Sequence, residues 1–146
     1  MRVRVRVPAS TSNLGAGFDC VGVAVSRWLT VTARLDPSAH HQVTIERAGT
    51  VRGLSLAAKH DLLYAGFTAA TRAVGAAVLR GLILEADSTI PIGRGLGSSA
   101  AAIVAGAVIA RELLSLELDA DALLALAAEL EGHPDNVAAG RSTEAR

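Results

Sequence analysis

The chain opens with a strict alternation of arginine and valine. On an extended backbone these residues separate into two faces: Arg2, Arg4 and Arg6 on one, and Val3, Val5 and Val7 on the other. A period of two is typical of a strand with one buried and one solvated face. Proline donates no backbone hydrogen bond, so we expect this strand to end at Pro8 and the arginines to face solvent.

The next segments alternate between loop and strand patterns. Residues 9–19 are rich in Ser, Thr, Asn and Gly and predict a loop. Runs of β-branched residues at 20–25 and 28–35 predict a pair of strands, and 41–49 predicts another. The neighbouring histidines His40 and His41 follow turn residues, so exposure to solvent is favoured over metal binding.

Helical spacing appears in the second half of the chain. Apolar residues recur every three or four positions within 60–80, and 118–132 shows a similar pattern with Asp119 placed to cap its start. Between them, 81–91 predicts a strand. Strands come first and helices then mix with strands, which indicates an α+β domain.

Composition narrows the class of protein. The 146 residues are 51% hydrophobic with no net charge, which fits one globular domain and gives no electrostatic case for nucleic acid or a membrane surface. Cys20 is the only cysteine, so an intrachain disulfide and a cysteine zinc site are excluded, and a reducing cytoplasm fits. The N-terminus does not resemble a signal peptide, and the longest apolar run, 100–110, is shorter than the ~20 residues of a membrane span.

The segment with the clearest chemistry is PIGRGLGSSAAAIVAGAVIA, residues 91–110. Glycines at 93, 95 and 97 precede two serines and a run of small apolar residues, which predicts a buried helix from about Ser98 to 113. The unpaired N–H groups of a first helical turn attract anions, and glycines let a phosphate approach the backbone closely. The serine hydroxyls are able to cap the helix, bind phosphate or reach a metal ion.

Glycine spacing alone also fits a turn that only introduces a helix, and that possibility stays open. Two nucleotide-binding motifs are excluded by the residues themselves. A P-loop needs a lysine that is absent here, and GRGLGS lacks the spacing of a dinucleotide-binding fingerprint.

PIGRGLGSSAAA resembles the phosphate loop of the GHMP kinases. VPASTSNLGAGFDCVGVAV and EGHPDN are similar to the homoserine kinase branch of that family, in the same order, and the resemblance covers residues 2–139. It implies transfer of the ATP γ-phosphoryl group to the side-chain hydroxyl of L-homoserine, on the threonine pathway. It also implies an amino-terminal α+β domain with a left-handed βαβ crossover.

The resemblance also assigns roles to residues. Loop residues would bind ATP: Pro91, Gly93, Arg94, Gly95, Leu96, Gly97, Ser98, Ser99 and Ala100. Mg²⁺ would be held by Ser98 or Ser99 together with Glu131, and the substrate by Asn13, Asp19, His133 and Asn136. Asn136 and Glu131 are the expected catalytic residues, whereas Asp135 is not assigned as a base. Taken alone, Glu131 is typical of a solvated helix end, Asp19 of a turn and His133 of a structural histidine.

The carboxyl-terminal part departs from the family pattern. Homoserine kinases run to about twice this length, so we expect residues 1–140 to be an incomplete ATP-binding domain and 141–146 an atypical tail. Three interpretations stay open: the amino-terminal part of a working homoserine kinase, an inactive fragment that at most binds nucleotide, or a GHMP kinase for another small alcohol. A homodimer also stays open.

Overall fold

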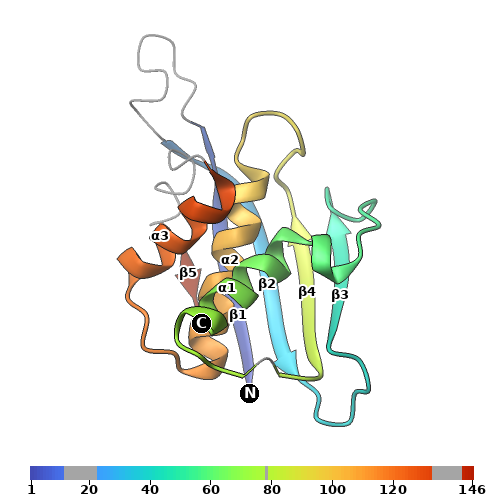
Figure 1. Cartoon of the computed structure of the whole chain (residues 1–146). Coiled ribbons are helices and arrows are strands. Elements are labelled where there is room, and N and C mark those ends of the chain that lie inside the picture. The colour runs from blue at the N-terminus through green and yellow to red at the C-terminus, as the bar shows by residue number, and fades with distance from the viewer. Residues whose placement is uncertain (12–22, 78, 133–142) are drawn as a thin grey trace.

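The computed structural model of the chain describes residues 1–11, 23–77, 79–132 and 143–146. In these segments one mixed sheet forms a layer, and three α-helices cover one of its faces (Figure 1). The elements in chain order are β1 (Arg2–Thr11), β2 (Val23–Leu35), β3 (Val43–Gly49), the short 3₁₀ helix η2 (Ala58–His60), α1 (Leu62–Ala73), β4 (Leu82–Ser88), α2 (Ser98–Leu114), α3 (Ala120–Glu131) and β5 (Glu144–Ala145). The expected α+β class is confirmed.

The strand order in the described sheet is β3-β4-β2-β1-β5. β1 is antiparallel to β2 and β5, and β2 is antiparallel to β4, whereas β3 and β4 are parallel. The parallel pair is joined through α1. In Figure 1, with the helices toward the viewer, β3 runs upward, the chain crosses in front through α1, and β4 runs upward to the left of β3. This crossover is left-handed, a hand that βαβ units rarely adopt.

Two strand predictions were wrong, and both concern the region where Pro8 of β1 pairs with β2. β1 does not end at Pro8 but continues to Thr11, and the predicted strand pair is the single strand β2. Pro8 lies opposite Trp28 and Ala9 lies opposite Val25, so the register shifts by two residues of β2. A bulge interrupts the hydrogen-bond ladder, and an interrupted ladder tolerates a proline that has no donor.

The helix boundaries also differ from the sequence pattern. The helix predicted over 60–80 starts at Leu62, capped by the Asp61 side chain, and ends at Ala73. Gly75 follows with φ of +67°, a left-handed conformation that stops helical propagation. The predicted cap of α3 is confirmed, because the Asp119 carboxylate accepts a hydrogen bond from the Ala122 N–H at 2.7 Å.

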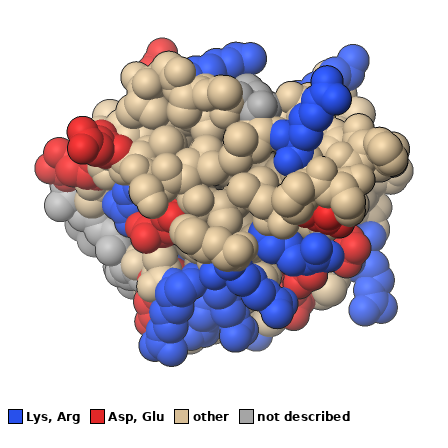
Figure 2. Space-filling view, turned by 90° about the horizontal axis from the view of Figure 1, so that it is seen from below, with Lys and Arg blue, Asp and Glu red and all other residues tan. Residues whose placement is uncertain are grey.

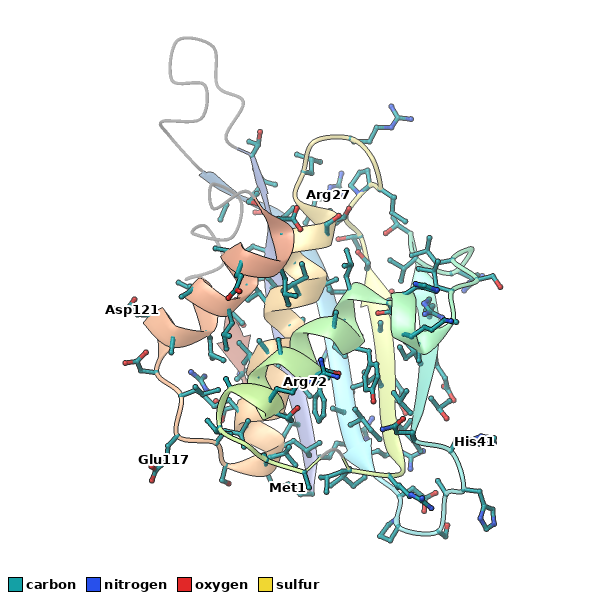
Figure 3. All side chains as sticks on the ribbon, viewed as in Figure 1. Met1, Arg27, His41, Arg72, Glu117 and Asp121 are labelled. Atoms are coloured by element: carbon teal, nitrogen blue, oxygen red, sulfur yellow. The ribbon has the colours of Figure 1, made fainter. Side chains whose placement is uncertain are left out.

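Helix α2 lies at the centre of the core, as its apolar sequence predicts. Most of its residues from Ala100 to Leu113 are buried, between the sheet and the other two helices. The opposite face of the sheet carries polar side chains. The predicted solvation is confirmed for Arg2 and Arg4, which are exposed, whereas Arg6 is half-buried because it stacks on the Trp28 ring. His40 and His41 are also exposed, as expected; Figure 3 shows His41 on the connection before β3, pointing away from the domain. Every helix in the described segments is too short or too polar to cross a bilayer.

Candidate functional site

The glycine loop between β4 and α2 has an alternating left-handed backbone. Gly93, Gly95 and Gly97 adopt φ values of +70°, +70° and +69°. A Cβ atom at Gly93 or Gly95 would meet nothing within 4 Å, so packing does not require glycine there. The backbone conformation requires it, and the space beside the loop is open to a ligand.

Neighbouring strands hold both ends of this loop in place. The Thr50 hydroxyl donates to the Ile90 carbonyl at 2.7 Å, and the Ile90 N–H donates to the Ser88 hydroxyl at 3.0 Å. Further along the loop, the Ser10 N–H of β1 donates to the Leu96 carbonyl at 2.9 Å. These bonds position the loop backbone without involving the exposed glycines.

The start of α2 is left without a side-chain cap. Gly97, which has no side chain, is the N-cap residue, and among the described residues no side-chain cap hydrogen bond is formed to the first turn. Capping by the serines, one of the three roles left open by the sequence, is therefore wrong, because Ser98 is already the first helical residue. The N–H groups of a first helical turn have no intrahelical acceptor, so those of α2 are available to an anion, favoured by the helix dipole.

A cavity of about 140 Å³ opens beside this helix start. Its walls come from the glycine loop, α1, α2, three strands and the segment after β3, and they are mainly apolar. Ser98 and Ser99 lie on its border, and Leu54, Leu56 and Ile92 are exposed hydrophobic residues on its lining. The dimensions and apolar walls suit a flat ring better than a chain of charged groups.

One buried ion pair lies in the wall of the cavity. The Asp61 carboxylate pairs with the Arg47 guanidinium of β3 and also accepts hydrogen bonds from the N–H groups of Leu63, at 2.8 Å, and Tyr64. The side chains of Arg47 and Asp61 are only 13% and 9% exposed. Sequence reasoning missed this pair; an aspartate directly before a helical pattern is the N-cap signal that would have found Asp61.

The structure brings one predicted metal ligand to the glycine loop end of the molecule. Glu131 is the last residue of α3, a helix that packs against α2, and Figure 1 draws the end of α3 next to the start of α2. No group of three or more His, Cys, Asp or Glu side chains gathers anywhere in the described segments.

The remaining predicted residues are not placed. Asn13, Asp19, His133, Asp135 and Asn136 lie outside the described residues. Their roles stay predictions. In the described part of the chain, the site therefore consists of the loop, the start of α2, the cavity and the end of α3.

Comparison with known proteins identifies the architecture. Residues 61–141 match the family model of the GHMP kinases N terminal domain. The chain belongs to the GHMP kinase family. Among curated proteins it is 48% identical over 141 residues to the homoserine kinase of Clavibacter michiganensis subsp. michiganensis and 46% identical over 136 residues to that of Carboxydothermus hydrogenoformans.

These matches cover 94% and 93% of this chain but 43% of each relative, so the chain spans less than half the length of the curated relatives it matches. A solved homoserine kinase from Cytophaga hutchinsonii superposes with a TM-score of 0.79 at 30% identity, covering 94% of this chain and 45% of that one. A mevalonate kinase from Methanococcus jannaschii superposes with a TM-score of 0.75 at 14% identity, over 98% of this chain and 52% of that one, and supports the fold alone.

Proposed function

We propose that this member of the GHMP kinase family binds ATP between the glycine loop and the start of α2. The triphosphate lies along residues 91–100, and the base occupies the adjoining apolar cavity. One observation carries the proposal: the uncapped first turn of α2 borders a cavity that Ser98 and Ser99 also line. Backbone N–H groups and left-handed glycines bind phosphate oxygens without a P-loop lysine.

The available oxygen ligands fit Mg²⁺ as the accompanying metal. Mg²⁺ is commonly held by one or two protein carboxylates together with substrate phosphates. Glu131 and a hydroxyl of Ser98 or Ser99 are the proposed protein ligands. When bound, the ion neutralises charge on the phosphate oxygens; the loop and helix orient the terminal phosphate, which is most of what phosphoryl transfer requires from a protein.

We further propose that the acceptor is the side-chain hydroxyl of L-homoserine, in a cytoplasmic step of threonine biosynthesis. The identity to homoserine kinases over nearly the whole chain supports this choice of substrate. In this proposal Asp19 accepts from the substrate ammonium group, and Asn13, His133 and Asn136 orient the amino acid through hydrogen bonds. Residues 1–140 then form the ATP-binding part of the enzyme and 141–146 an atypical tail.

A second candidate is nucleotide binding without turnover by these 146 residues alone. The coverage of the relatives favours it, since more than half of each relative has no counterpart in this sequence. The two candidates share the ATP site and differ in catalysis, so binding and turnover need separate experiments.

The binding experiment is calorimetric titration of ATP with Mg²⁺ into this chain and two glycine variants. Gly95→Ala and Gly75→Ala each introduce a Cβ at similar left-handed φ values, +70° and +67°, with nothing within 4 Å. Each substitution costs about 1–2 kcal/mol of backbone strain. We expect Gly95→Ala to weaken ATP binding at least tenfold and Gly75→Ala to leave it unchanged. The proposal is wrong if the unmodified chain does not bind ATP.

The turnover experiment is ADP release with L-homoserine, measured on this chain and on a full-length protein that contains it. Activity of the long form alone supports the second candidate for the isolated chain. In the active form, Glu131→Ala should lower turnover strongly because a metal ligand is lost. Unchanged turnover would refute the metal assignment, and activity only with another alcohol would refute the substrate.

A further inference from the structure

The outer face of the sheet carries a basic hollow on the side away from the helices. It has a volume of about 270 Å³ and is lined by Arg4, Arg6, Thr30, Glu144 and Arg146, which we call the arginine hollow. Figure 2, seen from below, shows basic atoms gathered along the lower margin, where the outer face of the sheet lies. Three guanidinium groups, the Glu144 carboxylate and the α-carboxylate of Arg146, the last residue of the sequence, give the hollow a net charge of +1.

Strand pairing sets two of these arginines directly against each other. The Arg4 N–H donates to an α-carboxyl oxygen of Arg146, the last residue of the sequence, at 2.7 Å, and the Arg146 N–H donates to the Arg4 carbonyl at 2.8 Å. Such a reciprocal pair places the two Cα atoms about 5.5 Å apart, with both side chains on the same face of the sheet. Like charges directly opposite each other are destabilising unless an anion lies between them.

The same sheet shows how such a conflict is resolved. Arg2 and Arg34 also lie directly opposite each other, and the Glu85 carboxylate of β4 contacts both, at 3.3 Å and 4.0 Å. In the described part of the chain, no carboxylate forms an ion pair with Arg4 or Arg146. The second arginine pair therefore lacks the bridging side-chain carboxylate that the first one has.

The third arginine is held in position. The Arg6 guanidinium carbon lies 4.2 Å from the centre of the Trp28 ring, and Arg6 also contacts the Glu144 carboxylate at 3.5 Å. Thr30 lies opposite Arg6 on β2 and adds a hydroxyl donor. The stacking and the ion pair limit the freedom of Arg6 and reduce the entropy lost when it binds a ligand.

We propose that the arginine hollow binds a phosphate-type dianion, either inorganic phosphate or a phosphate monoester. Guanidinium groups bind phosphate through paired hydrogen bonds, and such anions carry a charge of about −1.5 to −2 near neutral pH, opposite in sign to that of the hollow. The site does not depend on the proposed ATP site, because its residues lie on the opposite face of the sheet from the cavity lined by Leu29 and Ala86.

The test uses Trp28, the only tryptophan of the chain, as a reporter beside the hollow. Phosphate is titrated at constant ionic strength against chloride, following tryptophan fluorescence and Tm, and glycerol phosphate replaces it in a second arm to separate free phosphate from an ester. We expect a saturable fluorescence change and a rise in Tm. Arg4→Gln and Arg146→Gln should each weaken binding at least tenfold.

Three further variants control this test. Arg72→Gln removes an exposed arginine on α1, in the helix layer (Figure 3), and should bind phosphate normally, as should Gly75→Ala, which lies outside both sites. Arg4→Glu supplies the missing carboxylate within the protein, so it should melt at a higher temperature than Arg4→Gln and lose the phosphate response. The proposal is overturned if phosphate acts no differently from chloride, or if Arg4→Gln and Arg146→Gln bind like the unmodified chain.

Discussion

At the scale of single residues, Asp61 combines two stabilising roles in one carboxylate. It caps α1 and neutralises Arg47, which is almost buried between β3 and the cavity. In Asp61→Ala, the helix loses a cap worth about 1 kcal/mol, and a buried guanidinium is left unpaired, which typically costs about 3–5 kcal/mol. We expect the free energy of unfolding, measured with urea, to fall by about 3 kcal/mol or more.

Asp119 provides the matched control for this substitution. Its carboxylate caps α3 through one hydrogen bond to the Ala122 N–H, it is exposed, and it forms no ion pair within the described residues. Asp119→Ala should therefore cost about 1 kcal/mol, the value of a cap alone. Equal losses in the two variants would show that the buried pair adds no stability.

At the scale of elements, the sequence predicted the type of each long segment but not where the segments bend or meet. The alternating valines predicted β1, and the small apolar run predicted a buried α2. The bulge near Pro8 was not predictable, because a proline usually ends a strand and only the pairing with β2 shows where the ladder is interrupted. Likewise, the apolar period through 60–80 does not show that Gly75 ends α1 early.

The close contact between α1 and α2 is another feature that depends on how the elements pack and that the sequence pattern does not show. A Cβ on Gly106 would lie 1.9 Å from the Leu63 carbonyl oxygen, and one on Gly66 would lie 2.1 Å from the Ile103 carbonyl oxygen. The two helices therefore meet backbone to backbone. In the sequence, Gly106 is simply one more small residue in a run of small residues.

We expect Gly106→Ala to destabilise the domain by about 1–3 kcal/mol, because the added methyl group forces two buried helices apart. Thermal unfolding followed by circular dichroism measures this loss. Gly53→Ala is the control: no atom lies within 4 Å of its added Cβ and its φ is not left-handed, so its Tm should stay within about 2 °C of the unmodified chain. A tolerated Gly106→Ala would mean that the helices are not in backbone contact.

At the scale of the whole molecule, the candidate site divides into a part that the sequence predicts and a part that it does not. The phosphate loop is one continuous motif, so its glycines and serines could be found from spacing and family resemblance. The cavity is assembled from strands, helices and loops that are distant in the chain, and no local pattern connects Arg47, Asp61 and Ala102 before the fold is known. The proposed division, with the phosphates on the loop and the base in the cavity, therefore depends on the cavity, which becomes visible only in the folded chain.

Filling the cavity tests that division directly. Ala102 is half-buried on α2 and lines the cavity, so Ala102→Leu should occupy space that the base would use while leaving the loop backbone intact. We expect ATP affinity to fall at least tenfold and affinity for inorganic triphosphate to stay within twofold, both measured by calorimetry. Ala122→Leu, at a half-buried position near the start of α3 and outside the cavity lining, should change neither affinity. Equal losses for both ligands in Ala102→Leu would mean that the substitution disturbs the start of α2, and unchanged ATP affinity would mean that the base lies elsewhere.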